Sequence, residues 1–146
     1  MKNFFYLLLF SMLSLSLKAE LINIGLYPNQ KVSSFEFIPK AGKYTLYTEN
    51  GKLMEIGSKD MLVVIYDQGK IILKNKDLII GEFDKLNFIG TGWYNHFQLN
   101  VLKPFQKQLR YDDNLKLVLL RNRMQLVNNI DLDNYIAGVV EAEVGR

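Results

Sequence analysis

The chain has 146 residues, enough for one domain with its own hydrophobic core. It contains no cysteine, which excludes disulfides and thiolate metal sites, and its single histidine, His96, gives little support to a histidine-based metal site or a Ser-His-Asp triad. Two of the 18 basic residues, Lys2 and Lys18, lie in an N-terminal leader, so the other 16 nearly balance the 15 acidic residues. This balance does not indicate nucleic-acid binding, and we expect neither a metal nor another cofactor.

The leader, residues 1–19, is predicted to be a secretory signal peptide. It combines the basic residue Lys2 with an apolar run interrupted only by serines, and Ala19 offers a small residue at the cleavage site. The alternative is an uncleaved membrane anchor, for which the apolar run is short, because a bilayer span needs about 20 residues. We therefore expect export to the periplasm or cell surface, and a single domain over residues 20–146.

Between residues 21 and 128, short apolar and β-branched runs alternate with turn signals. A hairpin is predicted at Asn50-Gly51, a second strand is expected to end at Pro39, and residues 61–66 form a continuous apolar run predicted to be buried on both faces. The predicted class is α+β: predominantly antiparallel β, as a sheet or barrel-like sandwich, with a C-terminal amphipathic helix. The expected strands cover residues 21–26, 35–38, 43–48, 52–56, 61–66, 70–73, 78–80, 115–120 and 124–127.

Aromatic residues gather beside polar groups at residues 90–97. The flat rings of Trp93 and Tyr94 could stack on sugars, or Trp93 could plug the sheet while the adjacent glycines form a turn. His96 is predicted at the surface or at a strand edge.

Residues 130–146 carry the pattern of an amphipathic helix. Asp131 is a candidate N-cap, and Asp133 adds negative charge to the first turn, where the helix dipole favours it. The apolar residues fall on one stripe: Leu132, Tyr135, Ile136, Val139 and Val140. The preceding hairpin is expected to pack under Leu132, Ile136 and Val139 and so to fix where Glu143 points.

Glu143 falls within this stripe. At about 100° per residue it lies roughly 20° from Leu132, whereas Glu141 lies roughly 180° away and should be solvated. Burial disfavours the charged form of a carboxyl group, and a protonated carboxyl group can act as a general acid. The alternative is that the helix ends near Val140 and leaves Glu143 in a frayed, solvated last turn.

The segment from Asp131 to Glu143, DLDNYIAGVVEAE, resembles the signature of the stage II sporulation protein D/amidase-enhancer family, Leu-acidic-x-Tyr-Leu-x-Gly-Val-Val-x-x-Glu, with Ile136 in place of the usual leucine. Residues 110–115 and 125–128 are similar to the two family strands that precede this helix. The good resemblance covers residues 110–146.

The resemblance implies a peptidoglycan lytic transglycosylase whose catalytic acid/base is Glu143, acting on glycan strands. Tyr135, Trp93, Tyr94 and Arg110 are the expected substrate-binding residues; a hydrolase would instead need a second carboxylate, for which Asp112 and Asp113 are candidates. Arg110, Arg121 and Arg123 either hold an anionic cell-wall polymer or are simply solvated. The other hypothesis is a non-catalytic exported domain that binds cell wall or modulates an amidase.

The chain departs from the family pattern after Glu143. The family has a second long helix there, whereas this sequence has three more residues. We therefore expect residues 20–146 to correspond to the N-terminal portion of such a domain.

Overall fold

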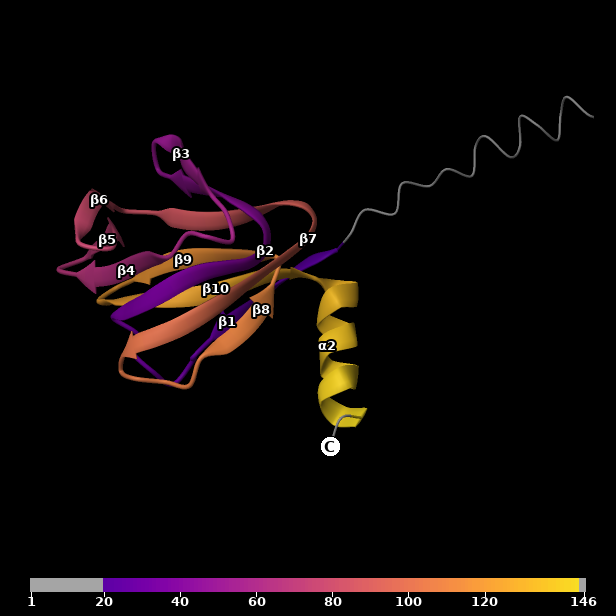
Figure 1. Cartoon of the computed structure of the whole chain (residues 1–146). Helices are drawn as coiled ribbons and strands as arrows, with labels where there is room; N and C mark the ends of the chain where they lie inside the picture. The colour runs from indigo at the N-terminus through magenta and orange to yellow at the C-terminus, as the bar shows by residue number, and fades with distance from the viewer. Residues whose placement is uncertain (1–19, 145–146) are drawn as a thin grey trace, which may run out of the picture.

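A computed structural model describes residues 20–144, which form one antiparallel sheet and a C-terminal helix (Figure 1). This confirms the predicted fold class, while the predicted signal peptide lies outside the described residues. Within residues 20–144, no helix has the length and apolar character needed to cross a membrane. The elements are β1 (Leu21–Leu26), β2 (Ser34–Thr48), β3 (Gly51–Ile56), β4 (Leu62–Asp67), β5 (Lys70–Asn75), β6 (Leu78–Phe83), β7 (Leu86–Lys103), β8 (Leu109–Asp112), β9 (Asn114–Leu120), β10 (Arg123–Asp131) and α2 (Leu132–Val144).

The sheet is built on two long strands, β2 and β7, which pair with each other along most of their length. The strand order is β1-β10-β9-β7-β2-β4-β5-β6, with β3 added to β2 and β8 added to β7. Each long strand changes its second partner along its length: β7 pairs first with β9 and then with β8, and β2 pairs first with β4 and then with β3. The sheet therefore branches at both long strands, and β8 and β1 each keep an edge that no described strand pairs.

Three local predictions are wrong. Pro39 does not end a strand, because β2 continues through it with register shifts near Ala41, as proline is tolerated where pairing is irregular. Residues 61–66 are not buried on both faces, since Leu62 and Val64 are buried while Val63 is only half-buried. The final strand does not stop at residue 127 but runs to Asp131, so two buried asparagines lie inside β10.

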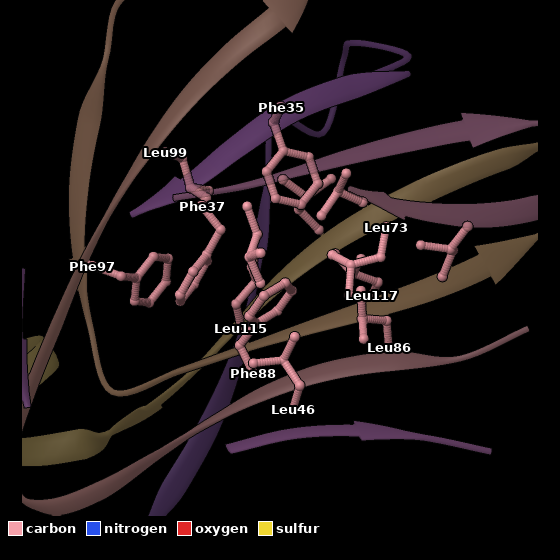
Figure 2. Packing of buried hydrophobic residues seen from close by; sticks show 14 of the residues in the cluster. Phe35, Phe37, Leu46, Leu73, Leu86, Phe88, Phe97, Leu99, Leu115 and Leu117 are labelled. Atoms are coloured by element: carbon pink, nitrogen blue, oxygen red, sulfur yellow. The ribbon is translucent and has the colours of Figure 1, made fainter. Parts of the chain in front are cut away.

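Aromatic side chains from β2 and β7 fill the centre of the core (Figure 2). The Phe37 ring stacks on Phe88 and Phe97, with centroid distances of 4.1 and 5.0 Å, and meets the edge of Tyr44 at 5.1 Å. All four rings are fully buried. Because rings on neighbouring strands interlock, their packing fixes how the two long strands lie on each other.

Replacing the central ring should cost much of the stability. We expect Phe37→Ala to lower the free energy of unfolding by about 3–5 kcal/mol, the usual loss for a buried phenylalanine, in urea unfolding followed by circular dichroism. Leu78→Ala is the control, since Leu78 is 71% exposed and should change stability by about 0.5 kcal/mol or less. Equal losses from both variants would contradict this assignment of the core.

Two tyrosines should make the fold sensitive to alkaline pH. Burial, together with the nearby charges of Asp113 and Asp112, raises the pKa of Tyr44 far above its ordinary value, and burial with a hydrogen bond to Tyr27 does the same for the pKa of Tyr111. The folded state therefore holds these protons more tightly than the unfolded chain, in which tyrosine ionises near pH 10. Stability from this source is complete below about pH 10 and is lost as the pH rises further.

We expect the free energy of unfolding to fall between about pH 9 and pH 11, and to fall less in Tyr44→Phe. The phenylalanine variant should be no less stable than the wild type near neutral pH, because the Tyr44 hydroxyl is buried without a hydrogen-bond partner among the described residues. Urea titrations at the two pH values test this, and an identical alkaline loss in both proteins would exclude Tyr44 as a cause.

Candidate functional site: a groove beside the C-terminal helix

The start of α2 is tied to the sheet by aspartate side chains. Asp131 Oδ1 accepts hydrogen bonds from the backbone N–H of Asp133 at 2.9 Å and of Asn134 at 3.4 Å, which confirms Asp131 as the N-cap. Asp113, between β8 and β9, accepts through Oδ2 from the Asp131 N–H at 2.8 Å and from the Asn134 side chain at 3.2 Å. The β8–β9 connection therefore fixes where the helix begins.

Two buried asparagines in β10 support this connection from below. Asn128 donates through its side-chain amide to the backbone carbonyls of Asp112 and Asn114, at 2.7 and 2.9 Å. Asn129 donates to Asn23 Oδ1 in β1 at 2.9 Å. Since both asparagines are at most 5% exposed, their amides must be paired inside the protein, and these pairings join β1, β10 and the β8–β9 connection into one unit.

The helix itself projects from the end of the sheet where β10 finishes (Figure 1) and has no buried residue. The expectation that the β9–β10 hairpin packs under Leu132, Ile136 and Val139 is therefore wrong: Ile136 is 50% exposed and Val139 is 44% exposed. The helix is exposed because β10 runs four residues beyond its predicted end, so that α2 begins beyond the end of the sheet. Half of the apolar stripe consequently faces solvent.

A groove of about 280 Å³ lies between α2 and the sheet. One wall is the unpaired side of β8, the floor is formed by β1 and β10, and the other wall is α2. Its surface is mainly apolar with a few polar groups, a combination typical of sites for organic ligands. The lining residues are Ile24, Leu26, Arg110, Tyr111, Asp112, Asn128, Ile130, Asn134, Tyr135, Gly138, Val139 and Ala142.

Two of the predicted substrate-binding residues, Arg110 and Tyr135, line this groove from opposite walls. Sequence analysis had no basis for bringing them together, because they are 25 positions apart and meet only through the fold. Arg110 supplies hydrogen-bond donors for an anionic or hydroxylated ligand, and the Tyr135 ring, 40% exposed, supplies a flat surface.

Glu143 is exposed and is not among the lining residues, so the prediction that it is sheltered from water is wrong for this structure. Glu141 is exposed as expected. At about 100° per residue, the helix residues that line the groove span an arc of roughly 140°, and Glu143 lies about 110° from its centre. It thus sits beside the groove, within about 20° of Ile136, on the half of the stripe that is open to solvent.

The other two predicted contacts, Trp93 and Tyr94, lie outside the groove on β7. Trp93 is fully exposed, so the interpretation in which it plugs the sheet is wrong. Tyr94 stacks on His96 with a centroid distance of 6.1 Å. His96 Nδ1 in turn lies 2.6 Å from Oδ1 of Asp112, which lines the groove. Tyr94 is therefore connected to the groove wall, whereas no contact connects Trp93 to it among the described residues.

The bulge that presents Trp93 is held by close packing at a glycine. Gly42 of β2 lies opposite residues 92–95 of β7. Its φ of 73° is a left-handed backbone conformation, which glycine adopts more readily than other residues. A Cβ there would lie 2.4 Å from Asn95 Oδ1 and 2.7 Å from the Tyr94 carbonyl oxygen. Asn95 is buried and donates to the Gly92 carbonyl at 3.1 Å. These contacts fix the backbone on both sides of Trp93.

Sequence reasoning missed three features of the site: the His96–Asp112 pair, the role of Asp113 at the helix start, and the buried side chain of Asn128. The prediction that His96 lies at a surface or strand edge is wrong, since it lies in β7 between β2 and β8 and is only partly exposed. Only the register of these strands could have revealed the pair. The unusual backbone of Asp113, with φ of 62°, leaves no sequence signal beyond the turn-favouring Asp-Asp-Asn.

Comparisons with protein-family models, curated proteins and solved structures gave no match to this chain.

Proposed function

We propose that this chain is a peptidoglycan lytic transglycosylase-like protein that binds glycan strands in the groove beside α2 and uses Glu143 as general acid/base. The observation that carries the proposal is the groove itself, which is lined by Arg110 from β8 and by Tyr135 from α2, the helix that bears Glu143. Export to the periplasm or cell surface belongs to the same proposal, because the substrate lies there.

The proposed chemistry needs one carboxyl group. Glu143 protonates the glycosidic oxygen, the bond to the anomeric carbon breaks, and the carboxylate then takes the proton of the sugar's own hydroxyl as that hydroxyl attacks the anomeric carbon. The product is an anhydro sugar, formed without water. A second carboxylate is not required, which agrees with Asp113 being committed to the start of α2 and Asp112 being paired with His96.

The exposure of Glu143 sets a condition on this mechanism. A general acid must meet the substrate in its protonated form, and removal of water from a carboxyl group favours that form. Glu143 shares the open half of the apolar stripe with Ile136 and Val140, so any surface that covers those side chains also removes water from the carboxyl group. The proposal therefore places the bound glycan, or protein packed on this half of α2, over Glu143 during the reaction.

The acid/base role is tested with Glu143→Gln, using Glu141→Gln as the matched control on the same helix. After incubation with denuded glycan strands, mass spectrometry should show anhydro chain ends from the wild type and the control. The Glu143→Gln yield should fall by about 10²-fold or more, the usual contribution of general acid–base catalysis. Equal anhydro yields from Glu143→Gln and Glu141→Gln would exclude Glu143 as the acid/base.

The groove is tested separately at Gly138. Nothing lies within 4 Å of a Cβ built on Gly138, so alanine fits and should stabilise the helix by about 1 kcal/mol. The same methyl group enters the groove and should weaken glycan binding. Glu141→Ala is the control, because alanine also favours helix there and Glu141 is exposed, lies outside the groove lining and points away from the apolar stripe. Hydrogen exchange of α2 and co-sedimentation with peptidoglycan measure the two effects.

If Gly138→Ala slows exchange without weakening binding, glycan does not occupy the groove. If Glu141→Ala weakens binding to the same extent, the effect comes from helix stability rather than from the groove. Loss of binding in Gly138→Ala alone supports the assignment.

A second candidate function is favoured by the exposure of Glu143: a non-catalytic domain that binds cell wall or modulates an amidase. It predicts binding to peptidoglycan, or enhancement of an added amidase, that survives Glu143→Gln and produces no new chain ends. The same mass-spectrometric experiment separates the two functions, because only the enzyme creates anhydro ends.

A further inference from the structure

A second polar site lies at the opposite end of β10 from α2. The β9–β10 basic pocket is an open hollow of about 420 Å³ lined by Lys31, Leu120, Arg121, Asn122 and Arg123. β10 begins at Arg123 and ends at Asp131, and at about 3.4 Å per residue it separates this pocket from the start of α2 by roughly 27 Å. Figure 1 shows the β9–β10 turn at the end of the sheet far from the helix.

Among residues 20–144, no salt bridge involves the cations of this pocket. Three of its five lining residues are cationic, and they come from two segments about 90 positions apart. Neither residues 27–33 nor residues 114–130 contain an acidic side chain. The salt bridges of the described residues are elsewhere, at Lys52–Glu55 and Lys70–Asp84, and the His96–Asp112 contact also lies outside the pocket.

The first residue of the β9–β10 turn, Arg121, has an unusual backbone conformation. Arg121 has a φ of 51° in a two-residue hairpin turn, a left-handed conformation that glycine adopts more readily. The sequence therefore holds an arginine where the backbone favours a residue without a side chain. Lys76 and three other non-glycine residues share this conformation among the described residues, so it does not by itself assign a role to Arg121, but it makes Arg121 replaceable by glycine.

We infer that the β9–β10 basic pocket binds an anionic polymer through its phosphate or carboxylate groups. Every charged side chain in the pocket is a cation that donates hydrogen bonds, and guanidinium groups such as those of Arg121 and Arg123 bind oxyanions with paired hydrogen bonds. An open hollow holds one hydrated ion weakly, because exposed ion pairs contribute little. A polymer with repeated charges binds such a surface more tightly, because once one charged group is bound, the neighbouring groups of the same polymer are held at a high local concentration. The site is independent of the proposed glycan groove.

The experiment uses fluorescently labelled polyphosphate and alginate as the phosphate and carboxylate probes, with binding to the full chain followed by fluorescence anisotropy. R121Q/R123Q should raise Kd by about tenfold or more, and K31Q by a few fold, through loss of charge-assisted contacts. The matched control is K59Q/K76Q, which removes the same charge from two exposed turn lysines outside the pocket. The K59Q/K76Q variant should change Kd by about twofold or less.

A second variant separates binding from folding. R121G suits the left-handed backbone, so it removes the side chain while the turn keeps its shape, and it should weaken polymer binding with an unchanged thermal melt.

The inference is overturned if R121Q/R123Q and K59Q/K76Q weaken binding equally, since only net charge would then matter. It is also overturned if neither polymer binds, or if phosphatidylglycerol vesicles bind more tightly than both polymers. The polymer that depends more strongly on the two arginines identifies the oxyanion.

Discussion

The Asp113 carboxylate determines how the functional end of the molecule is arranged. It accepts hydrogen bonds from the Asp131 backbone and the Asn134 side chain, and so joins the β8–β9 connection to the first turn of α2. Because α2 has no buried residue, hydrophobic packing does little to hold it, and the hydrogen bonds at its start set its direction. The width of the groove, and the side of it on which Glu143 lies, depend on this one polar junction.

The two ends of β10 have opposite electrostatic character. Residues 131–143 contain four acidic side chains and no basic one, whereas residues 114–130 contain three basic side chains and no acidic one. A long anionic polymer would be attracted to the basic end and repelled from the acidic end. The glycan proposed for the groove is therefore held there by stacking and hydrogen bonds, with Arg110 as the cation among the groove's lining residues.

Much of the fold could be predicted from the sequence because local chemistry specified it. The β2–β3 hairpin, the β9–β10 hairpin and the Asp131 cap were all predicted correctly, since each depends on residues close together in the chain; the first hairpin turns at Glu49-Asn50, with Gly51 already in β3. The failures came where a distant strand decided the outcome. Pro39 remains inside β2 because β7 pairs irregularly beside it, and Asn128 and Asn129 stay in a strand because β1, β9 and the β8–β9 connection satisfy their amides.

The sequence by itself determined the class of fold and the helix with its capped start, and it supplied candidate residues for binding a sugar and moving a proton. Only the tertiary structure decided that Arg110 and Tyr135 share a groove, that Trp93 stands free of the sheet, and that Glu143 faces water. Helical periodicity states which residues share a face, but not what that face meets. That depends on where β10 ends, and the pairing of distant strands sets this point.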